Sequence, residues 1–144
     1  MLKELFPQQI QKAKAESIWV YHLDLFCCGQ EVNAASGPRY DWERIGCKII
    51  ANHRQSDLLI VSGPVTPEIS TEIRRIYNEM KSPRFVMAVG SCACTGGMFS
   101  IEDVSNVRSL EQVIPVDLFV PGCPPRPESI IYGILQLKEK ILAK

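Results

Sequence analysis

Long apolar runs are missing from this 144-residue sequence. No stretch approaches the roughly 18 apolar residues that a membrane-spanning helix requires, and residues 1–7 lack the continuous apolar core of a secretory signal. An excess of charge of one sign is missing as well, because 16 basic residues balance 16 acidic ones. These absences predict an intracellular protein that does not itself span a membrane and has no general attraction for nucleic acid.

Nucleotide-binding and repeat patterns are also absent. No Gly-x-Gly-x-x-Gly motif occurs, and the segment after the first predicted strand offers Leu-Phe-Cys-Cys instead of a phosphate-cradling loop. No internal repeat and no low-complexity linker divides the chain. The length suits one domain with its own core. We therefore expect residues 1–144 to form a single domain that does not bind a nucleotide.

Strand-like apolar runs alternate with amphipathic helical patterns along the chain. Four runs predict β-strands, and the middle two are continuously apolar, as in strands buried on both faces: 18–23, 58–61, 85–89 and 116–120. Apolar residues at helical spacing predict four helices: 2–13, 41–53, 69–80 and 127–142. This alternation predicts an α/β fold with a mainly parallel sheet.

Three of these helices carry further signals of where they begin or which face they bury. Thr66 and Pro67 are expected to cap and start the helix over 69–80, and Pro127 to start the last one. The helix over 41–53 would place Trp42, Ile45 and Ile49 on one face.

Six cysteines stand out in a chain that lacks secretory features. Disulfides are a poor explanation in a reducing compartment, so metal ligation or redox chemistry is favoured. Cys27 and Cys28 follow the first predicted strand, Cys92 follows the third, and Cys123 follows the fourth. Because the carboxyl ends of parallel strands share one edge of a sheet, we expect these three loops to converge on one site.

Four converging thiolates suit either a [4Fe–4S] cluster or a structural zinc ion. The adjacent pair Cys27-Cys28 is awkward for one tetrahedral ion, whereas the irons of a cluster are spread over a cube. The Cys123-Pro124 step is also typical of cluster motifs. A cluster is therefore favoured over a zinc-stabilised interaction module. A redox thiol pair, Cys92 and Cys94, is a third alternative, and unliganded buried cysteines are a fourth.

Five motifs in order resemble the family of the complex I 20 kDa subunit, which includes the small subunits of membrane-bound [NiFe] hydrogenases and their sulfur-reducing relatives. The resemblance runs from about Trp19 to Leu137, and its motifs cover 27–32, 37–46, 62–66, 89–97 and 120–128. It implies a flavodoxin-like fold with helices on both faces of the sheet. It also implies one [4Fe–4S] cluster held by Cys27, Cys28, Cys92 and Cys123.

The resemblance further implies a place in a larger assembly. The family member is the electron-transfer subunit of an oxidoreductase complex and has no catalysis of its own. Its cluster is the last of a chain and passes electrons to a cavity shared with a large subunit of the hydrogenase or 49 kDa type. A ferredoxin-like iron–sulfur subunit and membrane antiporter-like subunits are the other implied partners. The expected location is peripheral, on the cytoplasmic side of the cell membrane.

Two features place the chain between branches of the family. The adjacent pair Cys27-Cys28 is typical of complex I, because membrane-bound hydrogenases separate these two cysteines. The segments 19–22 and 114–118 are more similar to the hydrogenases. The mixture favours a branch such as the archaeal membrane-bound sulfane-sulfur reductases, with a [NiFe] hydrogenase small subunit as the alternative.

Three polar residues near the motifs are candidates for roles at the cavity. Glu31 is implied to lie near the cluster and to carry protons, or else to anchor its loop. Arg39 is implied to face the cavity, where it would stabilise negative charge. Alternatively, Arg39 and Asp41 dock and cap the helix predicted over 41–53, since Asp is a good N-cap residue.

The remaining candidates are expected to be structural. The family pattern assigns Cys92 rather than Cys94 as the ligand. Cys47 is expected to pack in the core. His22 and His53 have no motif around them and are expected to be core or surface histidines.

Overall fold

A five-stranded parallel sheet forms the centre of the protein. The computed structural model describes residues 7–100 and 107–143. The strands lie in the order β2-β1-β3-β4-β5, and every strand pair is parallel. This is the flavodoxin-like order of doubly wound α/β folds. The strands are β1 (Ile18–Asp24), β2 (Cys47–Ile49), β3 (Leu58–Ser62), β4 (Phe85–Val89) and β5 (Leu118–Val120).

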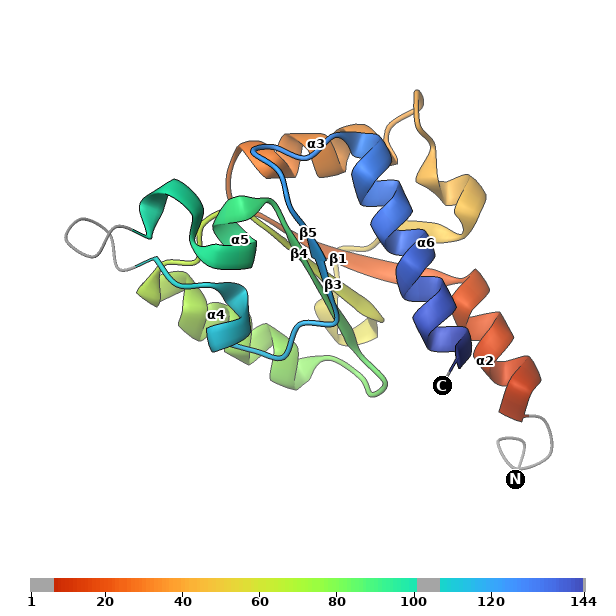
Figure 1. The fold of residues 1–144 in the computed structure, drawn as a ribbon. Coiled ribbons are helices and arrows are strands. Elements are labelled where there is room, and N and C mark those ends of the chain that lie inside the picture. Colours follow the sequence, from red (N-terminus) through yellow and green to blue (C-terminus); the bar gives the residue numbers. More distant parts are fainter. Residues whose placement is uncertain (1–6, 101–106, 144) are drawn as a thin grey trace.

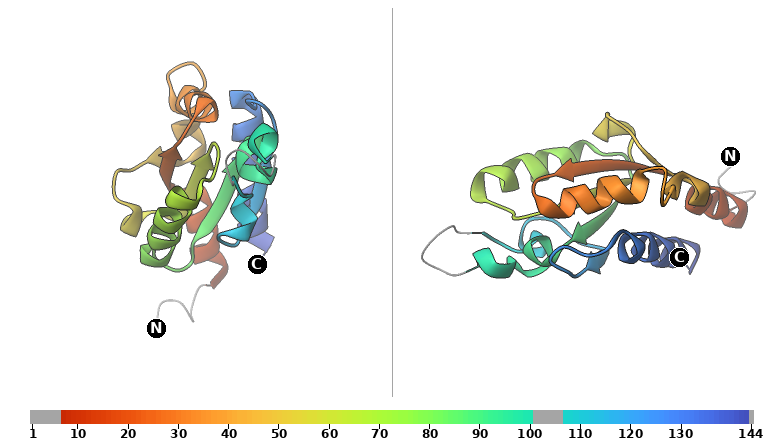
Figure 2. Two further views of the ribbon diagram at one scale, coloured as in Figure 1. Left: turned by 90° about the vertical axis from the view of Figure 1, so that its left-hand side faces the viewer. Right: turned by 90° about the horizontal axis from the view of Figure 1, so that it is seen from above.

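Helices cover both faces of this sheet (Figure 1). The α-helices are α2 (Pro7–Glu16), α3 (Cys27–Ser36), α4 (Pro67–Glu79), α5 (Ser91–Thr95) and α6 (Pro127–Ala143). The 3₁₀ turns are η1 (Trp42–Ile45), η2 (His53–Gln55), η3 (Gly97–Phe99) and η4 (Leu110–Gln112). Helices α2, α3 and α6 pack on one face, with α2 beside α6 (Figures 1 and 2), whereas α4 and α5 pack on the other.

Two cores separate along the sheet because successive side chains of a strand point to opposite faces. In β3, Leu58 and Ile60 enter the core beneath α3 and α6, whereas Leu59 and Val61 enter the core beneath α4. All five residues of β3 are buried. A continuously apolar run is therefore what a central parallel strand requires.

The predicted α/β fold with helices on both faces is confirmed. The four predicted strands are present, although β5 is shorter than predicted and begins at Leu118. Thr66 caps α4 as expected, because its side chain accepts a hydrogen bond from the backbone N–H of Ile69, and Pro67 begins the helix. Helix α6 begins at Pro127, as predicted. The first part of the helix predicted over 2–13 lies outside the described residues.

The prediction of a helix over 41–53 is wrong. This segment contains η1, β2 and the first residue of η2, and the turn at Gly46 has a left-handed backbone (φ 79°) that ends η1. Residues Cys47 to Ile49 then pair with the first half of β1. The apolar spacing fitted a helix, but pairing with an unpaired strand edge satisfies the backbone groups of this segment equally well.

Within the described ranges, no helix combines the length and the apolar character needed to cross a membrane.

Candidate functional site

The candidate site lies at the carboxyl edge of the sheet, where the loops after β1, β4 and β5 meet. The strand order reverses between β1 and β3, which opens a crevice at their carboxyl ends. Cys27 and Cys28 are the first residues of α3, at this crevice. Cys92 lies in the first turn of α5, directly after β4, and Cys123 follows β5.

Backbone hydrogen bonds hold the loops after β4 and β5 together. The N–H of Gly90 donates to the carbonyl of Val120 at 2.8 Å, and the N–H of Ser91 donates to the carbonyl of Gly122 at 2.8 Å. The Ser91 hydroxyl also donates to this carbonyl at 3.1 Å. The segments carrying Cys92 and Cys123 are therefore held together by protein hydrogen bonds alone.

Gly90 allows the loop after β4 to approach the first turn of α3. Its backbone has φ 90°, a conformation that residues with a side chain rarely adopt. A Cβ atom at this position would collide with Sγ of Cys28. The absence of a side chain at Gly90 thus brings the Cys28 thiol against the strand end that leads to Cys92.

The four thiols lie within electrostatic range of one another. Burial raises the pKa of Cys28 to about 12, with further contributions first from Cys27 and then from Cys92 and Cys123. The pKa of Cys92 is also raised, first by burial and then by Cys123 and Cys27. Cys28 and Cys92 are buried, whereas Cys27 and Cys123 are exposed. The set therefore has an inner, dry side and an outer side open to solvent or to a partner.

This donor set fits an iron–sulfur cluster. Four thiols come from three loops at one edge of the sheet, and the pKa of Cys28 responds to the other three. Helix α3 has no side-chain cap, so the backbone amides of Cys27 and Cys28 have no intrahelical acceptor, whereas the N–H of Gly29 donates to the carbonyl of Phe26 at 2.8 Å. Such amides can donate to cluster sulfurs. In the described part of the chain, no three His, Cys, Asp or Glu side chains are arranged to hold a single metal ion.

Apolar side chains border the exposed part of the site. Phe26, directly before Cys27, is 53% exposed, and its ring stacks edge to face on Phe99 with 6.1 Å between ring centroids. Met98 is 70% exposed in the same η3 segment that contains Phe99. Exposed apolar groups beside a functional site suit a surface that is covered by a partner.

Glu31 and Arg39 lie at different positions relative to α3. Glu31 is half-buried on α3, one turn after the cysteine pair. Arg39 follows the far end of this ten-residue helix, which is about 15 Å long. Its guanidinium lies 5.7 Å from the centroid of the Tyr40 ring. Along the chain, Glu31 is thus close to the cysteine pair, whereas Arg39 is separated from it by the length of α3.

The expectation for Asp41 as a helix cap is wrong. Asp41 precedes η1 with a left-handed backbone (φ 45°), and its side chain makes no capping hydrogen bond. The loop is instead docked onto α6 by its neighbour Tyr40, whose hydroxyl donates to Oε1 of Glu128 at 3.2 Å.

Cys94 and Cys47 lie apart from the four candidate ligands. Cys94 packs against the core beneath α4, and its thiol lies 3.7 Å from the carbonyl oxygen of Ala88, to which it donates. Cys47 is buried in the opposite core at the start of β2, where burial raises its pKa to about 11. Both are packing residues in the structure.

Both histidines make structural contacts. His53 lies 2.8 Å from Glu79 Oε2, on the amino side of the sheet. His22 is half-buried on β1 and lies 2.7 Å from the hydroxyl of the buried Ser62. Burial lowers the pKa of His22.

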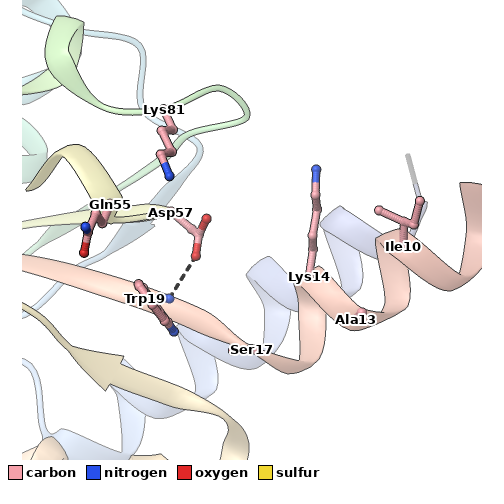
Figure 3. A pocket seen from close by; sticks show the side chains of 8 residues that line it. All are labelled: Ile10, Ala13, Lys14, Ser17, Trp19, Gln55, Asp57 and Lys81. Atoms are coloured by element: carbon pink, nitrogen blue, oxygen red, sulfur yellow. Dashed lines mark hydrogen bonds between the residues drawn. The ribbon is translucent and has the colours of Figure 1, made fainter. Parts of the chain in front are cut away.

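An open cavity of about 450 Å³ lies at the opposite, amino edge of the sheet (Figure 3). Its lining comes from α2, the start of β1 and the segments before β3 and β4, and contains no thiol: Ile10, Ala13, Lys14, Ser17, Trp19, Gln55, Asp57 and Lys81. One of its carboxylate oxygens, Oδ2 of Asp57, accepts a hydrogen bond from the backbone N–H of Trp19 at 3.1 Å. The cavity is separate from the cysteine site.

The structure adds residues that motif reading missed. Asp24 at the end of β1 and Asn33 on α3 are hydrogen-bonded at 3.0 Å, directly beside the cysteine pair in the fold. No motif marked them. The only signal in the sequence was the position of Asp24 at a strand end, three residues before Cys27.

Sequence comparison relates the chain to respiratory enzymes. Residues 26–137 match the family described as NADH ubiquinone oxidoreductase, 20 Kd subunit. An NADH-quinone oxidoreductase subunit from Amoebophilus asiaticus is 45% identical over 132 residues, which cover 92% of this chain and 82% of that protein. The corresponding NADH-quinone oxidoreductase subunit from Clostridium beijerinckii is 44% identical, over 90% of this chain and 76% of its own length.

Structural comparison gives similar relatives. A chain from the membrane-bound sulfane sulfur reductase, described as an archaeal respiratory membrane complex, has a TM-score of 0.88 and 34% identity. The match covers 96% of this chain and 77% of that one. A chain of an NAD⁺-reducing [NiFe]-hydrogenase matches with a TM-score of 0.63 and 20% identity, over 86% of this chain and 92% of its own, which shows the shared fold.

Proposed function

Because the chain belongs to the NADH ubiquinone oxidoreductase 20 Kd subunit family, we propose that it is an electron-transfer subunit holding one [4Fe–4S] cluster. The proposed ligands are Cys27, Cys28, Cys92 and Cys123. The chain is a subunit of an oxidoreductase complex, as its relatives are. Its own part is to receive an electron and pass it on.

The observation that carries this proposal is the meeting of four thiols at one sheet edge. They come from three loops that are far apart in sequence, and they influence one another electrostatically. Neither Cys47 nor Cys94, which pack in the cores, belongs to this group. A set of four thiolates is the usual protein ligand set of a [4Fe–4S] cluster.

The chain's own residues would hold the cluster and set its reduction potential. When bound, the cluster supplies one-electron redox chemistry. Buried Cys28 and Cys92 would keep water from its inner side, and the backbone amides of Cys27 and Cys28 would offer hydrogen bonds that favour the reduced state. The exposed Cys27 and Cys123 lie on the outer side, next to the apolar rim of Phe26 and Met98. This outer side is where electrons would leave towards a partner.

The proposed partners follow from the family. A hydrogenase- or 49 kDa-like large subunit would cover the apolar rim and hold the cavity that receives the electrons. A ferredoxin-like iron–sulfur subunit would supply electrons, and antiporter-like subunits would anchor the complex in the membrane. The chain would then lie peripherally on the cytoplasmic side. Glu31, half-buried one turn from the cysteine pair, is proposed as a proton carrier, and Arg39 as a residue facing the cavity.

Anaerobic purification with iron and sulfide analysis and EPR tests the cluster. We expect about four irons and four sulfides per chain and a reduced-cluster signal, which Cys28→Ser removes or alters. Cys47→Ser and Cys94→Ser are matched controls that should keep the signal. Zinc without iron and sulfide would favour a zinc-stabilised interaction module instead. An unchanged cluster in Cys28→Ser would exclude the proposed ligand set.

The terminal acceptor is proposed to be sulfane sulfur or quinone, as in the named relatives. The neighbouring large subunit separates the possibilities. Two Cys-x2-Cys pairs would indicate a [NiFe] hydrogenase, one pair a sulfur reductase, and none a quinone reductase. Assays of the purified complex with hydrogen, polysulfide and quinone would then test this assignment directly.

A further inference from the structure

Helix α3 presents the cysteine pair, but its first turn has no capping side chain. The N-cap position is occupied by Phe26, which offers no hydrogen-bonding group. A helix end without a cap is less firmly held than one with Ser, Thr, Asp or Asn. Another contact must therefore hold the first turn of α3, which carries Cys27 and Cys28, against the sheet.

Asp24 provides this attachment. It is the last residue of β1, and one carboxylate oxygen, Oδ2, accepts a hydrogen bond of 3.0 Å from Nδ2 of Asn33, near the end of α3. The other oxygen, Oδ1, lies against the Cα atom of Gly29, where any Cβ would collide with it. The carboxylate thus contacts α3 at its first turn and again one turn later.

The strand end that carries Asp24 is itself fixed to the next strand. His22 on β1 lies 2.7 Å from the Ser62 hydroxyl at the end of β3, and this hydroxyl donates to the carbonyl of Leu23 at 3.2 Å. Since the hydroxyl proton is used in that bond, Nε2–H of His22 is the donor to Ser62. The cysteine pair is therefore linked to the two strands at which the sheet order reverses.

We propose that Asp24 is a positioning residue for the iron–sulfur centre, which holds the turn of Cys27 and Cys28 and lowers the reduction potential through its negative charge. This inference rests on the proposed function. The attachment acts through Asn33 and Gly29. The charge acts because a carboxylate near an anionic cluster disfavours the addition of an electron. Asp24 is exposed, so solvent weakens this second effect without removing it.

Four variants of the full chain, purified anaerobically in its complex, separate the two effects. Asp24→Ala removes attachment and charge, Asn33→Ala removes the hydrogen bond between Asp24 and α3 but keeps the charge, and Asp24→Asn keeps an acceptor for Asn33 but removes the charge. Glu139→Gln, at an exposed position near the end of α6, removes the same charge far from the site. The readouts are the rate of iron loss to a chelator, the EPR line shape and the midpoint potential from a redox titration.

Asp24→Ala and Asn33→Ala should lose iron a few-fold faster than wild type, with a broader EPR signal. Asp24→Asn should lose iron at the wild-type rate, while the reduced fraction at a fixed potential rises a few-fold. Glu139→Gln should change neither. Wild-type iron loss in both alanine variants would overturn the positioning role, and an unshifted potential in Asp24→Asn would overturn the charge effect. A wild-type protein without iron and sulfide would instead refute the proposed function.

Discussion

The two edges of the sheet are built from different interactions. At the carboxyl edge, thiols and glycines dominate. Because Gly90 has no side chain, its backbone can approach the thiol of Cys28 closely. At the amino edge, charged pairs dominate. Glu79 at the end of α4 contacts His53 at 2.8 Å, Arg54 at 3.0 Å and Arg75 at 3.0 Å.

This difference shows how one fold separates function from stability. All strands run in the same direction, so the loops that follow them meet at one edge and can share a site. Helices that connect one strand to the next end at the amino edge. There the ion pairs of Glu79 hold the end of α4 against η2. The open cavity beside Trp19 also lies at this edge, away from the thiols. Changes at the two edges should therefore have separable consequences.

The largest expected contrast comes from adding one methyl group at each edge. Gly90→Ala places a Cβ against Cys28 Sγ, and we expect most of the bound iron to be lost. Gly46→Ala, at the amino edge, places a Cβ against the backbone carbonyl of Glu16. Both positions have positive φ, and holding a residue with a side chain in such a conformation costs about 1–3 kcal/mol. Iron analysis and thermal unfolding of the two variants would measure the contrast.

Gly46→Ala should lower stability while the folded fraction keeps its iron. Equal loss of iron in both variants would mean that the cysteine site responds to any destabilisation, and the separation of the edges would fail.

A smaller effect is expected from the N-cap of α4, which lies at the carboxyl edge but in the loop that carries no cysteine. Thr66→Ala removes the hydrogen bond that its side chain accepts from Ile69 N–H and should cost about 1 kcal/mol of unfolding free energy. Thr66→Ser, which keeps the hydroxyl, is the matched control. Denaturant unfolding measures the cost, and iron content and EPR should stay as in wild type. A changed EPR signal would extend the functional site to the loop after β3.

The smallest effect is expected at Glu79, and it depends on pH. Hydrogen bonds from His53 and Arg54, and then from Arg75, lower the pKa of Glu79 from its ordinary value near 4.5 to about 2. The stabilisation is therefore present above about pH 4.5 and is lost as the pH falls towards 2. Glu79→Gln should lower the melting temperature modestly at neutral pH, and its difference from wild type should shrink through this window.

Thermal unfolding of wild type and Glu79→Gln side by side at each pH cancels the acid effects that both share. A difference that stays constant from neutral pH down to pH 2 would show that the ion pairs contribute nothing.

Four of the five strands and the helices α2, α4 and α6 could be predicted because their residues leave few alternatives. The run from Leu58 to Val61 is apolar without interruption, which suits only a buried element, and its length suits a strand. Helix α4 was marked at its start by Thr66 and Pro67. The family resemblance is confirmed by the match over residues 26–137.

Strand β2 and helices α3 and α5 were not predicted, and the first two were missed for clear physical reasons. The segment 41–53 has helical apolar spacing, yet Cys47 to Ile49 form β2 because the outer edge of β1 was available for pairing. Helix α3 was missed because its first residues are Cys27, Cys28 and Gly29, which carry no helix-starting signal. Its position is decided by contacts with Asp24 and the sheet.

Convergence of three cysteine loops could be predicted, since it follows from parallel strands alone. That Cys27, Cys28, Cys92 and Cys123 bind a cluster stays a prediction, as do the roles of Glu31 and Arg39. The polar group of His22, Asp24, Asn33 and Ser62 could not be predicted. Its members come from β1, α3 and β3, and only the register of the two strands and the packing of α3 on the sheet bring them together.

The sequence by itself determined the α/β class, the family and the edge at which the cysteines gather, because alternating strand and helix patterns imply parallel strands and local motifs mark the family. The tertiary structure alone decided which side chains support that edge. The distance from Gly90 to Cys28, the contact of Asp24 with Gly29 and the separate burial of Cys47 and Cys94 depend on how elements pack across space. Packing is specified by many residues together, and no local pattern records it.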